Sequence, residues 1–315
     1  MTNRITEVKL PGDTVRGMLE RVQANDGVEA FSEQFLAGLD DARLAHTHFA
    51  YRSGDGDGDG DGDGSVLGLA SLAPDGSAEL AVDPDHRGGG IGTALVGAVL
   101  ERRDDAGLWA HGNLPAARAL AAELGFVVVR ELLVMSVDGD ALRGAAEVPE
   151  LPEGYTATNY TEATRRWGRA DVERAWLKAN NDAFSWHPEQ GGWDEARLHA
   201  GMEAEWFDPD GVLLLYHGEE LAGFHWTKVH PDGTGEVYVV GLDSGYRRKG
   251  LGDPLVRIGL AHLVRRGAQQ VKLYVEADNE PAVARYEALG FHTAESHVVY
   301  QKPGATREDV KTIKS

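Results

Sequence analysis

Residues 242–252 read Leu-Asp-Ser-Gly-Tyr-Arg-Arg-Lys-Gly-Leu-Gly, and residues 82–92 read Val-Asp-Pro-Asp-His-Arg-Gly-Gly-Gly-Ile-Gly. In both stretches an apolar segment, 236–242 or 78–82, runs into a turn rich in glycine and basic residues. Apolar residues at helical spacing follow the turn. We therefore predict a strand, a turn and a helix at both places.

The two turns belong to a longer repeat. Arg247 lies 160 positions (247 − 87) after Arg87, and the triplet Leu-Gly-Phe at 124–126 recurs at 289–291, 165 positions (290 − 125) later. The chain of 315 residues is long enough for two domains of about 150 residues each. Because the order and spacing of both landmarks are kept, the sequence predicts a tandem duplication.

The domain boundary is expected within residues 138–154, where Gly, Pro and acidic residues replace periodic apolar residues. The polar residues at the end of the chain lack periodicity and predict a loose tail. Strands and helices are mixed within each repeat, so the expected fold is α+β (mixed α/β), with two tandem domains of the same kind. The predicted parts are a first domain at 1–145, a second at 153–302 and a tail at 303–315.

The second repeat has the clearer secondary-structure signal. One face of its predicted helix carries Leu251, Leu255, Ile258 and His262. Residues 271–276 alternate apolar and polar, as in a strand with two distinct faces. Asn279 as cap and Pro281 in the first turn predict a further helix that ends at Gly290, with a last strand at 291–301.

Composition and charge exclude several classes of function. The absence of cysteine excludes disulfides, thiolate metal sites and a cysteine nucleophile. The net charge of −20 disfavours nucleic acid and anionic membranes as partners. No apolar run reaches the roughly 18 residues of a membrane span, and the N-terminal residues lack the apolar core of a signal peptide. We expect a cytoplasmic monomer that binds a small molecule and no metal.

A strict Gly-Asp alternation occupies residues 54–64. Such a segment is too flexible and too charged to pack, so a surface loop is expected. A calcium-binding loop is the alternative, because such loops are also rich in Asp and Gly. The glutamate that ends an EF-hand loop and the apolar residues of β-helix repeats are missing, which favours the surface loop.

A turn of the form Arg-x-x-Gly-x-Gly between strand and helix can hold a pyrophosphate. Gly90 and Gly92, like Gly250 and Gly252, let the backbone approach a ligand closely. The amides at the helix start point at one place, and the helix dipole adds positive charge there. A dinucleotide-binding turn is the competing interpretation, but neither repeat has G-x-G-x-x-G in register, and there is no Walker motif.

The two turns differ in their basic residues. Arg247, Arg248 and Lys249 supply the counter-charge in the second repeat. The first repeat keeps Arg87, with His86 beside it. We therefore predict that the second repeat holds an anion through more charges than the first.

These residues resemble the GCN5-related N-acetyltransferase (GNAT) superfamily, whose members bind the pyrophosphate of acetyl-CoA on this turn. A closer resemblance, covering nearly the whole chain, is to two-domain members that acetylate the cysteinyl amine of a cysteine–glucosamine–inositol conjugate. It rests on 187–193 (His-Pro-Glu-Gln-Gly-Gly-Trp), 206–211 (Trp-Phe-Asp-Pro-Asp-Gly), 223–231 (Gly-Phe-His-Trp-Thr-Lys-Val-His-Pro), 235–239 (Gly-Glu-Val-Tyr-Val) and 109–112 (Trp-Ala-His-Gly). The resemblance implies an acetyl-CoA-dependent N-acetyltransferase with two tandem GNAT domains.

The resemblance also implies which residues contact acetyl-CoA. In the first repeat they are Leu80, Ala81, Val82, Gly88, Gly89, Gly90, Ile91, Gly92 and Thr93. In the second repeat they are Val240, Gly241, Leu242, Arg247, Arg248, Lys249, Gly250, Leu251, Gly252, Asp253, Asn279, Glu280, Pro281, Ala282, Val283 and Ala284.

Acetyl transfer from a thioester to an amine needs a neutral amine, a polarised carbonyl and a protonated leaving thiolate. By resemblance, Glu236 is the general base and Tyr286 donates the proton to sulfur. Carboxylates and donors suit a polyhydroxylated sugar that carries a cationic amine. The substrate contacts that the resemblance implies are Glu33, Glu189, Lys228, Glu236 and Tyr274.

The first repeat departs from this pattern. Aligning the two turns places Gly76 opposite Glu236, and aligning the two Leu-Gly-Phe triplets places Ala121 opposite Tyr286. Glu79 lies nearby, but on the opposite strand parity. We therefore predict a first domain that lacks both base and acid, can still hold acetyl-CoA and helps to shape the substrate cleft.

Two other functions stay open at this point. One is a duplicated acetyltransferase that acts on another amine, such as an aminoglycoside or a protein N-terminus, because the fold does not determine the acceptor. The other is a non-enzymatic acyl-CoA sensor, which the first repeat alone would suggest.

Overall fold

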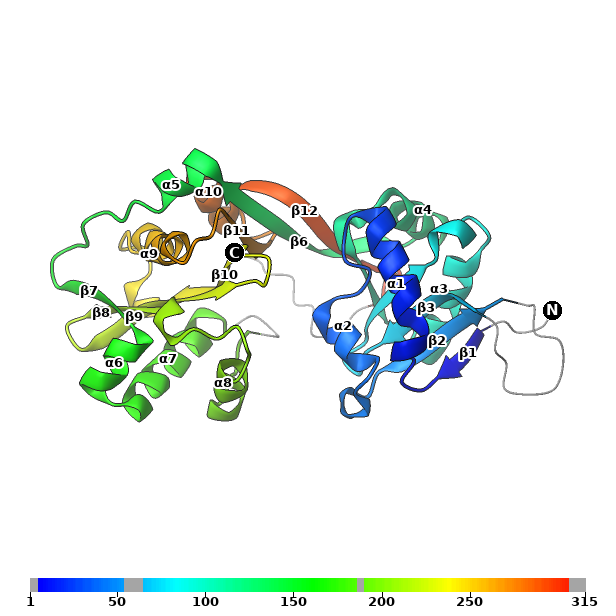
Figure 1. The fold of residues 1–315 in the computed structure, drawn as a ribbon, viewed down its shortest axis with the longest axis horizontal. Coiled ribbons are helices and arrows are strands. Elements are labelled where there is room, and N and C mark those ends of the chain that lie inside the picture. The colour runs from blue at the N-terminus through cyan, green and yellow to red at the C-terminus, as the bar shows by residue number, and fades with distance from the viewer. Residues whose placement is uncertain (1–4, 54–64, 186–189, 306–315) are drawn as a thin grey trace. The chain divides into compact units, whose positions relative to one another are not determined.

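The computed structural model describes residues 5–53, 65–185 and 190–305. The chain forms two compact units, shown in Figure 1. Unit 1 comprises Met1–Leu132 with Ser296–Ser315, and unit 2 comprises Leu133–Glu295. The Gly-Asp segment 54–64, most of the predicted tail and Glu189 lie outside the described residues.

Unit 1 is built on a sheet with the strand order β1-β2-β3-β4-β5-β12, in which β4 and β5 are parallel and the other pairs with a given register are antiparallel. Its elements are β1 (Ile5–Val8), α1 (Gly12–Asp26), α2 (Glu33–Gly38), η1 (Ala42–Leu44), β2 (Thr47–Arg52), β3 (Val66–Leu72), β4 (Ser77–Val82), η2 (Pro84–His86), α3 (Ile91–Arg102), β5 (Gly107–Ala110), η3 (His111–Asn113), α4 (Pro115–Glu123) and parts of β6 (Val127–Asp138) and β12 (His292–Gln301).

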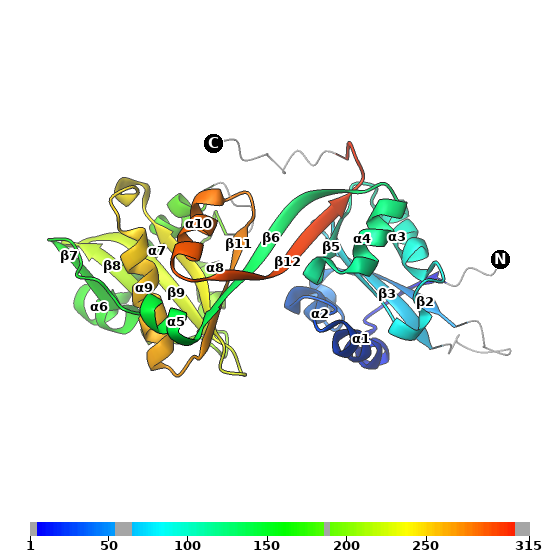
Figure 2. The same cartoon turned by 90° about the horizontal axis from the view of Figure 1, so that it is seen from above.

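Helices cover both faces of the unit 1 sheet, α1 and α2 on one face and α3 and α4 on the other (Figure 2). The alternation of side chains along β3 explains the two cores. Leu69 packs against α1 and α2, whereas its neighbour Ala70 packs against α3. Each face thus buries one set of alternating strand residues.

Unit 2 repeats this plan with the strand order β6-β11-β10-β9-β8-β7. Its elements are parts of β6 and β12, α5 (Gly139–Ala145), β7 (Tyr155–Asn159), α6 (Tyr160–Trp167), α7 (Arg169–Ala183), α8 (Glu195–Met202), η4 (Pro209–Gly211), β8 (Val212–His217), β9 (Glu220–Val229), β10 (Gly235–Leu242), η5 (Ser244–Tyr246), α9 (Gly252–Arg265), β11 (Gln270–Glu276) and α10 (Glu280–Ala288). Figure 1 shows α6, α7 and α8 on one face of this sheet and α9 on the other.

The last strands of the two repeats pass from one unit to the other. β6 belongs to unit 1 up to Leu132 and to unit 2 from Leu133, and β12 changes unit between Glu295 and Ser296. In unit 1, β12 pairs antiparallel with β5, with Val299 opposite Trp109. In unit 2, β6 is the neighbour of β11. Each sheet is therefore completed by a strand from the other repeat.

The boundaries of the two compact units therefore differ from those of the repeats, which we predicted at 1–145 and 153–302. Residues 138–154, where we expected only irregular structure, contain the helix α5. Leu142 and Ala145 of α5 are buried in the core of unit 2, with α9 and β11. Apolar side chains at helical spacing within a polar segment were enough to form this helix, because tertiary packing stabilises it.

The predicted strand–turn–helix units are confirmed as β4–η2–α3 and β10–η5–α9. The alternation along β11 is confirmed as well, since Val271, Leu273 and Val275 are buried. Asn279 precedes α10 with Pro281 in the first turn, but no side-chain hydrogen bond caps the helix. The backbone carbonyl of Asn279 accepts from the amides of Ala282 and Val283 instead.

A β-bulge in β10 changes the alignment of the repeats. The pairing of β10 with β9 shifts between Val237 and Val239, so Tyr238 is an extra residue. The pairing of β4 with β3 has no such shift. Glu236 lies opposite Lys272 of β11, and Ser77 lies opposite Gly107 of β5 at the equivalent place. The counterpart of Glu236 is therefore Ser77, and the alignment with Gly76 was wrong by the one bulge residue.

A buried histidine joins β9 to α9 in unit 2. The ring of His225 has no exposed surface, and its Nδ1 lies 3.1 Å from the carbonyl oxygen of Leu255. Any side chain at Gly259 would collide with this ring. Burial lowers the pKa of His225 to about 4, so the ring is neutral at pH 7 and Nδ1 donates to the carbonyl.

No helix in the described ranges is long and apolar enough to cross a membrane.

Candidate functional site: two glycine-rich turns and one buried carboxylate

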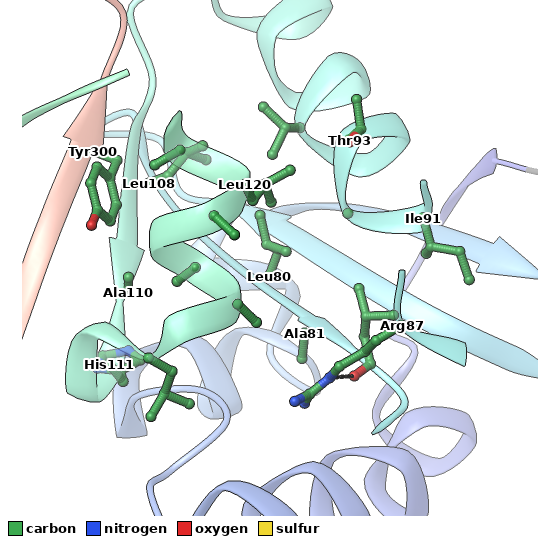
Figure 3. Close-up of a pocket in the computed structure, with 18 of the residues that line it drawn as sticks. Leu80, Ala81, Arg87, Ile91, Thr93, Leu108, Ala110, His111, Leu120 and Tyr300 are labelled. Atoms are coloured by element: carbon green, nitrogen blue, oxygen red, sulfur yellow. Dashed lines mark hydrogen bonds between the residues drawn. The ribbon is translucent and has the colours of Figure 1, made fainter. Parts of the chain in front are cut away.

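Unit 1 contains a cavity of about 490 Å³ beside its Gly-rich turn (Figure 3). Eight of the nine residues predicted to contact acetyl-CoA in this repeat line the cavity, and Gly89 is exposed in the same turn. The remaining lining includes residues of α1 and the segment after it, the turn itself, α3, β5, η3, α4 and the end of β12. The eight predicted lining residues are Leu80, Ala81, Val82, Gly88, Gly90, Ile91, Gly92 and Thr93.

The cavity exists because two parallel strands separate. β4 pairs with β5 at 77–79, opposite 107–109. Beyond Glu79, β4 continues to Val82 paired only with β3 among the described strands. The edge of 80–82 that faces β5 therefore has backbone groups available to a ligand. β10 repeats this arrangement, since its pairing with β11 ends at Val237 while its pairing with β9 runs on to Leu242.

Arg87 anchors the turn of unit 1. Its Nε donates to the carbonyl oxygen of Val82 at 3.0 Å, the dashed bond in Figure 3, and both terminal nitrogens donate to Asp26 of α1 at 2.8 Å. The hydrogen bond from Arg87 holds the pKa of Asp26 below its usual value. The positive charge of Arg87 is therefore already neutralised by the carboxylate of Asp26.

Arg247 plays the same part in unit 2. Its Nε donates to the carbonyl oxygen of Leu242 at 3.4 Å, and its Nη2 donates to the carbonyl oxygen of Asp182 in α7 at 2.9 Å. In both units, hydrogen bonds thus connect the arginine of the turn to a helix that comes earlier in the repeat, α1 in unit 1 and α7 in unit 2.

Arg248 is held in a backbone conformation that suits glycine better. Its φ angle is 61°, and the equivalent Gly88 of unit 1 has a φ of 74°. A left-handed conformation costs a non-glycine residue roughly 1 kcal/mol or more. Arg248 and Lys249 are both exposed on this turn. An arginine kept at such a position indicates that its side chain has a use there.

Arg285 of α10 is a residue that the sequence analysis missed. A side chain at Gly252, the first residue of α9, would collide with the guanidinium of Arg285. In unit 1 the equivalent position beside Gly92 is occupied by Leu120, which lines the cavity. The missed signal lies in the repeat itself, because Leu120 and Arg285 are also separated by the Leu-Gly-Phe offset of 165 positions.

Glu236 lies where the pairing between β10 and β11 ends. Its side chain is 7% exposed, and Oε2 lies 2.5 Å from Nε2 of His230. His230 is the second residue that the sequence analysis missed, although it lies within the motif at 223–231. The signal was the short loop between β9 and β10, which brings residues six apart onto the two ends of one hairpin.

Aromatic rings and lysines surround Glu236 on one sheet face. Lys228 is the β9 residue opposite Glu236, and its Nζ lies 5.0 Å from the ring centre of Trp206 and 6.0 Å from that of Tyr238. The Tyr238 and Trp206 rings pack edge to face at 4.7 Å. Tyr238 is the bulge residue and is 36% exposed. The face thus combines cations, a carboxylate and exposed aromatic surface.

The other predicted site residues have different environments. Tyr274 follows Lys272 on β11, on the side of the strand that Glu236 shares, and is 45% exposed. Tyr286 of α10 packs on Phe291, and burial raises its pKa to about 12. Glu33 is the exposed first residue of α2 in unit 1. The residues at 279–284 form the start of α10, and Leu251 is buried beneath the turn.

Glu79 of β4 makes its polar contacts within unit 1. Its side chain is buried, with Oε2 accepting from the amide of Ser32 at 2.8 Å and Oε1 lying 3.0 Å from Nε2 of His111. The Nδ1 atoms of His111 and His297 are 3.1 Å apart. These contacts join the start of α2 to β4, η3 and β12, and Glu79 itself does not line the cavity.

Two family models match the chain, the acetyltransferase (GNAT) family at residues 174–291 and the acetyltransferase (GNAT) domain at residues 50–128. A GCN5-related N-acetyltransferase from Sphaerobacter thermophilus superposes with a TM-score of 0.69, at 22% identity, over 95% of this chain and 96% of that one. A tandem GNAT protein from the clavulanic acid pathway superposes with a TM-score of 0.64, at 21% identity, over 94% and 97% of the two chains. Fold and sites together define a tandem acetyltransferase of the GNAT class.

Full-length relatives narrow this class. The mycothiol acetyltransferase of Corynebacterium efficiens is 54% identical over 286 residues, covering 90% of both chains. That of Corynebacterium aurimucosum is 50% identical over 312 residues, covering 96% of this chain and 98% of the other. This chain belongs to the mycothiol acetyltransferase family.

Proposed function

We propose that the chain transfers an acetyl group from acetyl-CoA to the cysteinyl amine of cysteine–glucosamine–inositol (desacetylmycothiol), the last step of mycothiol biosynthesis. The observation that carries the proposal is the buried carboxylate of Glu236 at the point where β10 leaves β11. Relatives that are 50–54% identical over at least 90% of this chain are named mycothiol acetyltransferases. No comparison favours another amine or a sensor without activity.

Acetyl-CoA lies along the backbone of β10 in this proposal. The pyrophosphate binds at the turn 247–252, where amides of the turn and the start of α9 converge. The pantetheine and the acetyl carbonyl lie against 240–242, whose edge toward β11 is unpaired. The start of α10 at 279–284 flanks the cofactor on the other side.

The chemical steps follow from these positions. Glu236 removes a proton from the acceptor ammonium, and the neutral amine attacks the thioester carbon, forming the C–N bond. Backbone amides of β10 stabilise the negative oxygen of the tetrahedral intermediate. The C–S bond then breaks, and the leaving thiolate takes the phenolic proton of Tyr286. The attacking nitrogen loses its second proton, which restores the phenol of Tyr286 through solvent, and Glu236 releases its proton to solvent. Since the pKa of Tyr286 is about 12, its proton is present at neutral pH.

The acceptor binds on the face that contains Lys228 and Tyr274. Hydroxyl groups of a sugar and an inositol can accept from lysine and both donate to and accept from tyrosine. Trp206 and Tyr238 supply aromatic surface next to Lys228. Glu33 of unit 1 and Glu189, which lies outside the described residues, complete the proposed set of substrate contacts.

The two repeats have different roles in this proposal. The first repeat, 1–145, holds acetyl-CoA in the cavity of unit 1 and does not catalyse transfer, because Ser77 and Ala121 stand where the second repeat has Glu236 and Tyr286. The second repeat, 153–302, is catalytic. No metal takes part, and the acceptor amine is the only other substrate.

The test is an acetyl-transfer assay with acetyl-CoA and the cysteinyl conjugate, beside an aminoglycoside and a peptide N-terminus at equal concentration. Wild type is expected to acetylate the conjugate with the highest kcat/KM. Glu236→Gln keeps the shape and removes the base, so kcat should fall by roughly 10²–10⁴. Faster acetylation of another amine would overturn the substrate, and near wild-type kcat for Glu236→Gln at pH 7 would overturn the base.

A further inference from the structure

The hairpin of β9 and β10, which contains Glu236, also contains the residue that contacts its carboxylate. The amide of His230 donates to the carbonyl oxygen of Thr234 at 2.8 Å, and the amide of Gly233 donates back to the carbonyl oxygen of His230 at 2.9 Å. Asp232 Oδ1 accepts from the amide of Thr234 at 2.9 Å. This tight turn fixes the backbone of His230 and directs its Nε2 to within 2.5 Å of Glu236 Oε2.

The side chains of Glu236 and His230 are nearly closed to water, and His230 is the more exposed of the two. The side chain of Glu236 is 7% exposed and that of His230 is 16% exposed. In the described part of the chain, His230 is the only residue whose side chain hydrogen-bonds to Glu236. One carboxylate oxygen is thus committed to His230, which leaves Oε1 for a substrate proton.

The other charged groups around the pair are known from the strand register. Lys228 of β9 and Lys272 of β11 are the residues opposite Glu236 on its two sides. Asp232 belongs to the turn, and its backbone hydrogen bond from Thr234 lowers its pKa, with smaller contributions from the charges of His230 and Lys272. The strand register thus places one lysine on each side of Glu236.

We propose that His230 is a positioning residue for Glu236, an inference that rests on the proposed function of Glu236 as base. As a neutral imidazole, His230 donates from Nε2 to Oε2 and holds the carboxylate with Oε1 directed at the acceptor ammonium. The same side chain therefore sets the geometry of the base.

The chemistry explains why a histidine suits this position. A third permanent cation from Lys or Arg would stabilise the carboxylate at every pH and make proton removal from the ammonium less favourable. A neutral imidazole positions the carboxylate without this penalty.

The experiment compares wild type with His230→Gln, His230→Ala and Glu236→Gln, and uses His292→Gln, on the exposed start of β12, as the matched control. The Gln side chain can place an amide donor where Nε2 stands, but it does not titrate. Values of kcat and KM for both substrates are measured from pH 5.5 to 9, and thermal unfolding is recorded for every variant.

We expect His230→Ala to lose about 10–100-fold in kcat, since a misplaced catalytic group costs up to about 10²-fold, with the KM for acetyl-CoA little changed. His230→Gln should recover most of that loss. The control His292→Gln should keep the wild-type kcat and KM.

Two results would overturn the inference. One is a wild-type kcat in both His230 variants. The other is an equal loss of kcat in His230→Gln and His230→Ala, with no rescue by the amide donor of Gln, which would mean a structural role. Failure of the proposed function is distinct, because it would appear as retained activity in Glu236→Gln whatever the His230 variants do.

Discussion

The guanidinium of Arg285 lies against Gly252, at the first residue of α9 and beside the turn of unit 2. Helix N-termini carry partial positive charge, so a cation there is unfavourable unless an anion lies close to both. The side chain of Arg285 makes no ion pair or hydrogen bond within the described ranges. The phosphates of acetyl-CoA are the anions that the proposed function supplies at this place, and Leu120 of unit 1 has no such role.

We therefore expect Arg285→Leu, which copies unit 1, to raise the KM for acetyl-CoA about 5–20-fold, as a charge-assisted hydrogen bond is worth roughly 1–3 kcal/mol. The KM for the acceptor should change little. Arg265→Leu, on the exposed end of α9, is the matched control. An unchanged KM in both variants, at low and at moderate salt, would remove Arg285 from the cofactor site.

Arg248 offers a test in which binding and stability move in opposite directions. Arg248→Gly relieves a positive φ angle of 61° and removes a cation from the turn. The melting temperature should stay the same or rise, while the KM for acetyl-CoA rises several-fold. A fall in melting temperature with an unchanged KM would show that the arginine serves the fold alone.

For the contact between Arg87 and Asp26 in unit 1 we expect the reverse, a loss of stability with activity kept. Arg87→Ala leaves the carboxylate of Asp26, which is 11% exposed, without its bidentate partner. The free energy of unfolding should fall by about 1–3 kcal/mol, the usual effect of an unpaired buried polar group. Transfer in unit 2 should keep most of its kcat. Loss of turnover at unchanged stability would show that unit 1 takes part in catalysis.

Tyr286 should act as an acid without limiting the rate at alkaline pH. Tyr286→Phe removes only the hydroxyl, so acetyl-CoA should still bind while kcat falls. Because the pKa of Tyr286 is about 12, the ratio of wild-type to variant kcat should be constant from pH 7 to about 9.5. A ratio that declines toward pH 9 would mean that another group protonates the thiolate.

The buried ring of His225 should make the fold sensitive to acid. Its pKa is about 4 in the folded chain and about 6.5 when unfolded, so the unfolded chain takes up the proton first as pH falls. The neutral ring's contribution is complete above about pH 6.5 and is lost toward pH 4. The shift corresponds to about 3 kcal/mol.

The measurement for His225 is urea unfolding at pH 7 and pH 5 for wild type and His225→Asn. The Asn amide can still donate to the carbonyl oxygen of Leu255, but it does not titrate. The variant should be less stable at pH 7 because it leaves a cavity beside Gly259. It should also lose less stability between pH 7 and 5 than wild type. Parallel losses in the two proteins would contradict the assignment.

Local patterns determined much of this protein. The strand, turn and helix around Arg247 follow from short-range spacing of apolar residues and from glycines, both of which act within a few residues of the chain. The repeat also predicted two such turns, whereas the residues that line the cavity in unit 1 came from the resemblance to a family. The site residues Glu236 and Tyr286 came from resemblance to a family, not from spacing.

Contacts between distant segments were decided only by the tertiary structure. An alternating strand such as 291–301 presents the same two faces whichever sheet it joins, so its pattern could not show that β12 completes unit 1. The bulge at Tyr238 depends on pairing with β9. Because of this bulge, Ser77 is the residue of the first repeat at the position equivalent to Glu236. The contacts of His230 with Glu236 and of Arg285 with Gly252 likewise needed the folded chain, because hydrophobic periodicity defines faces and not neighbours.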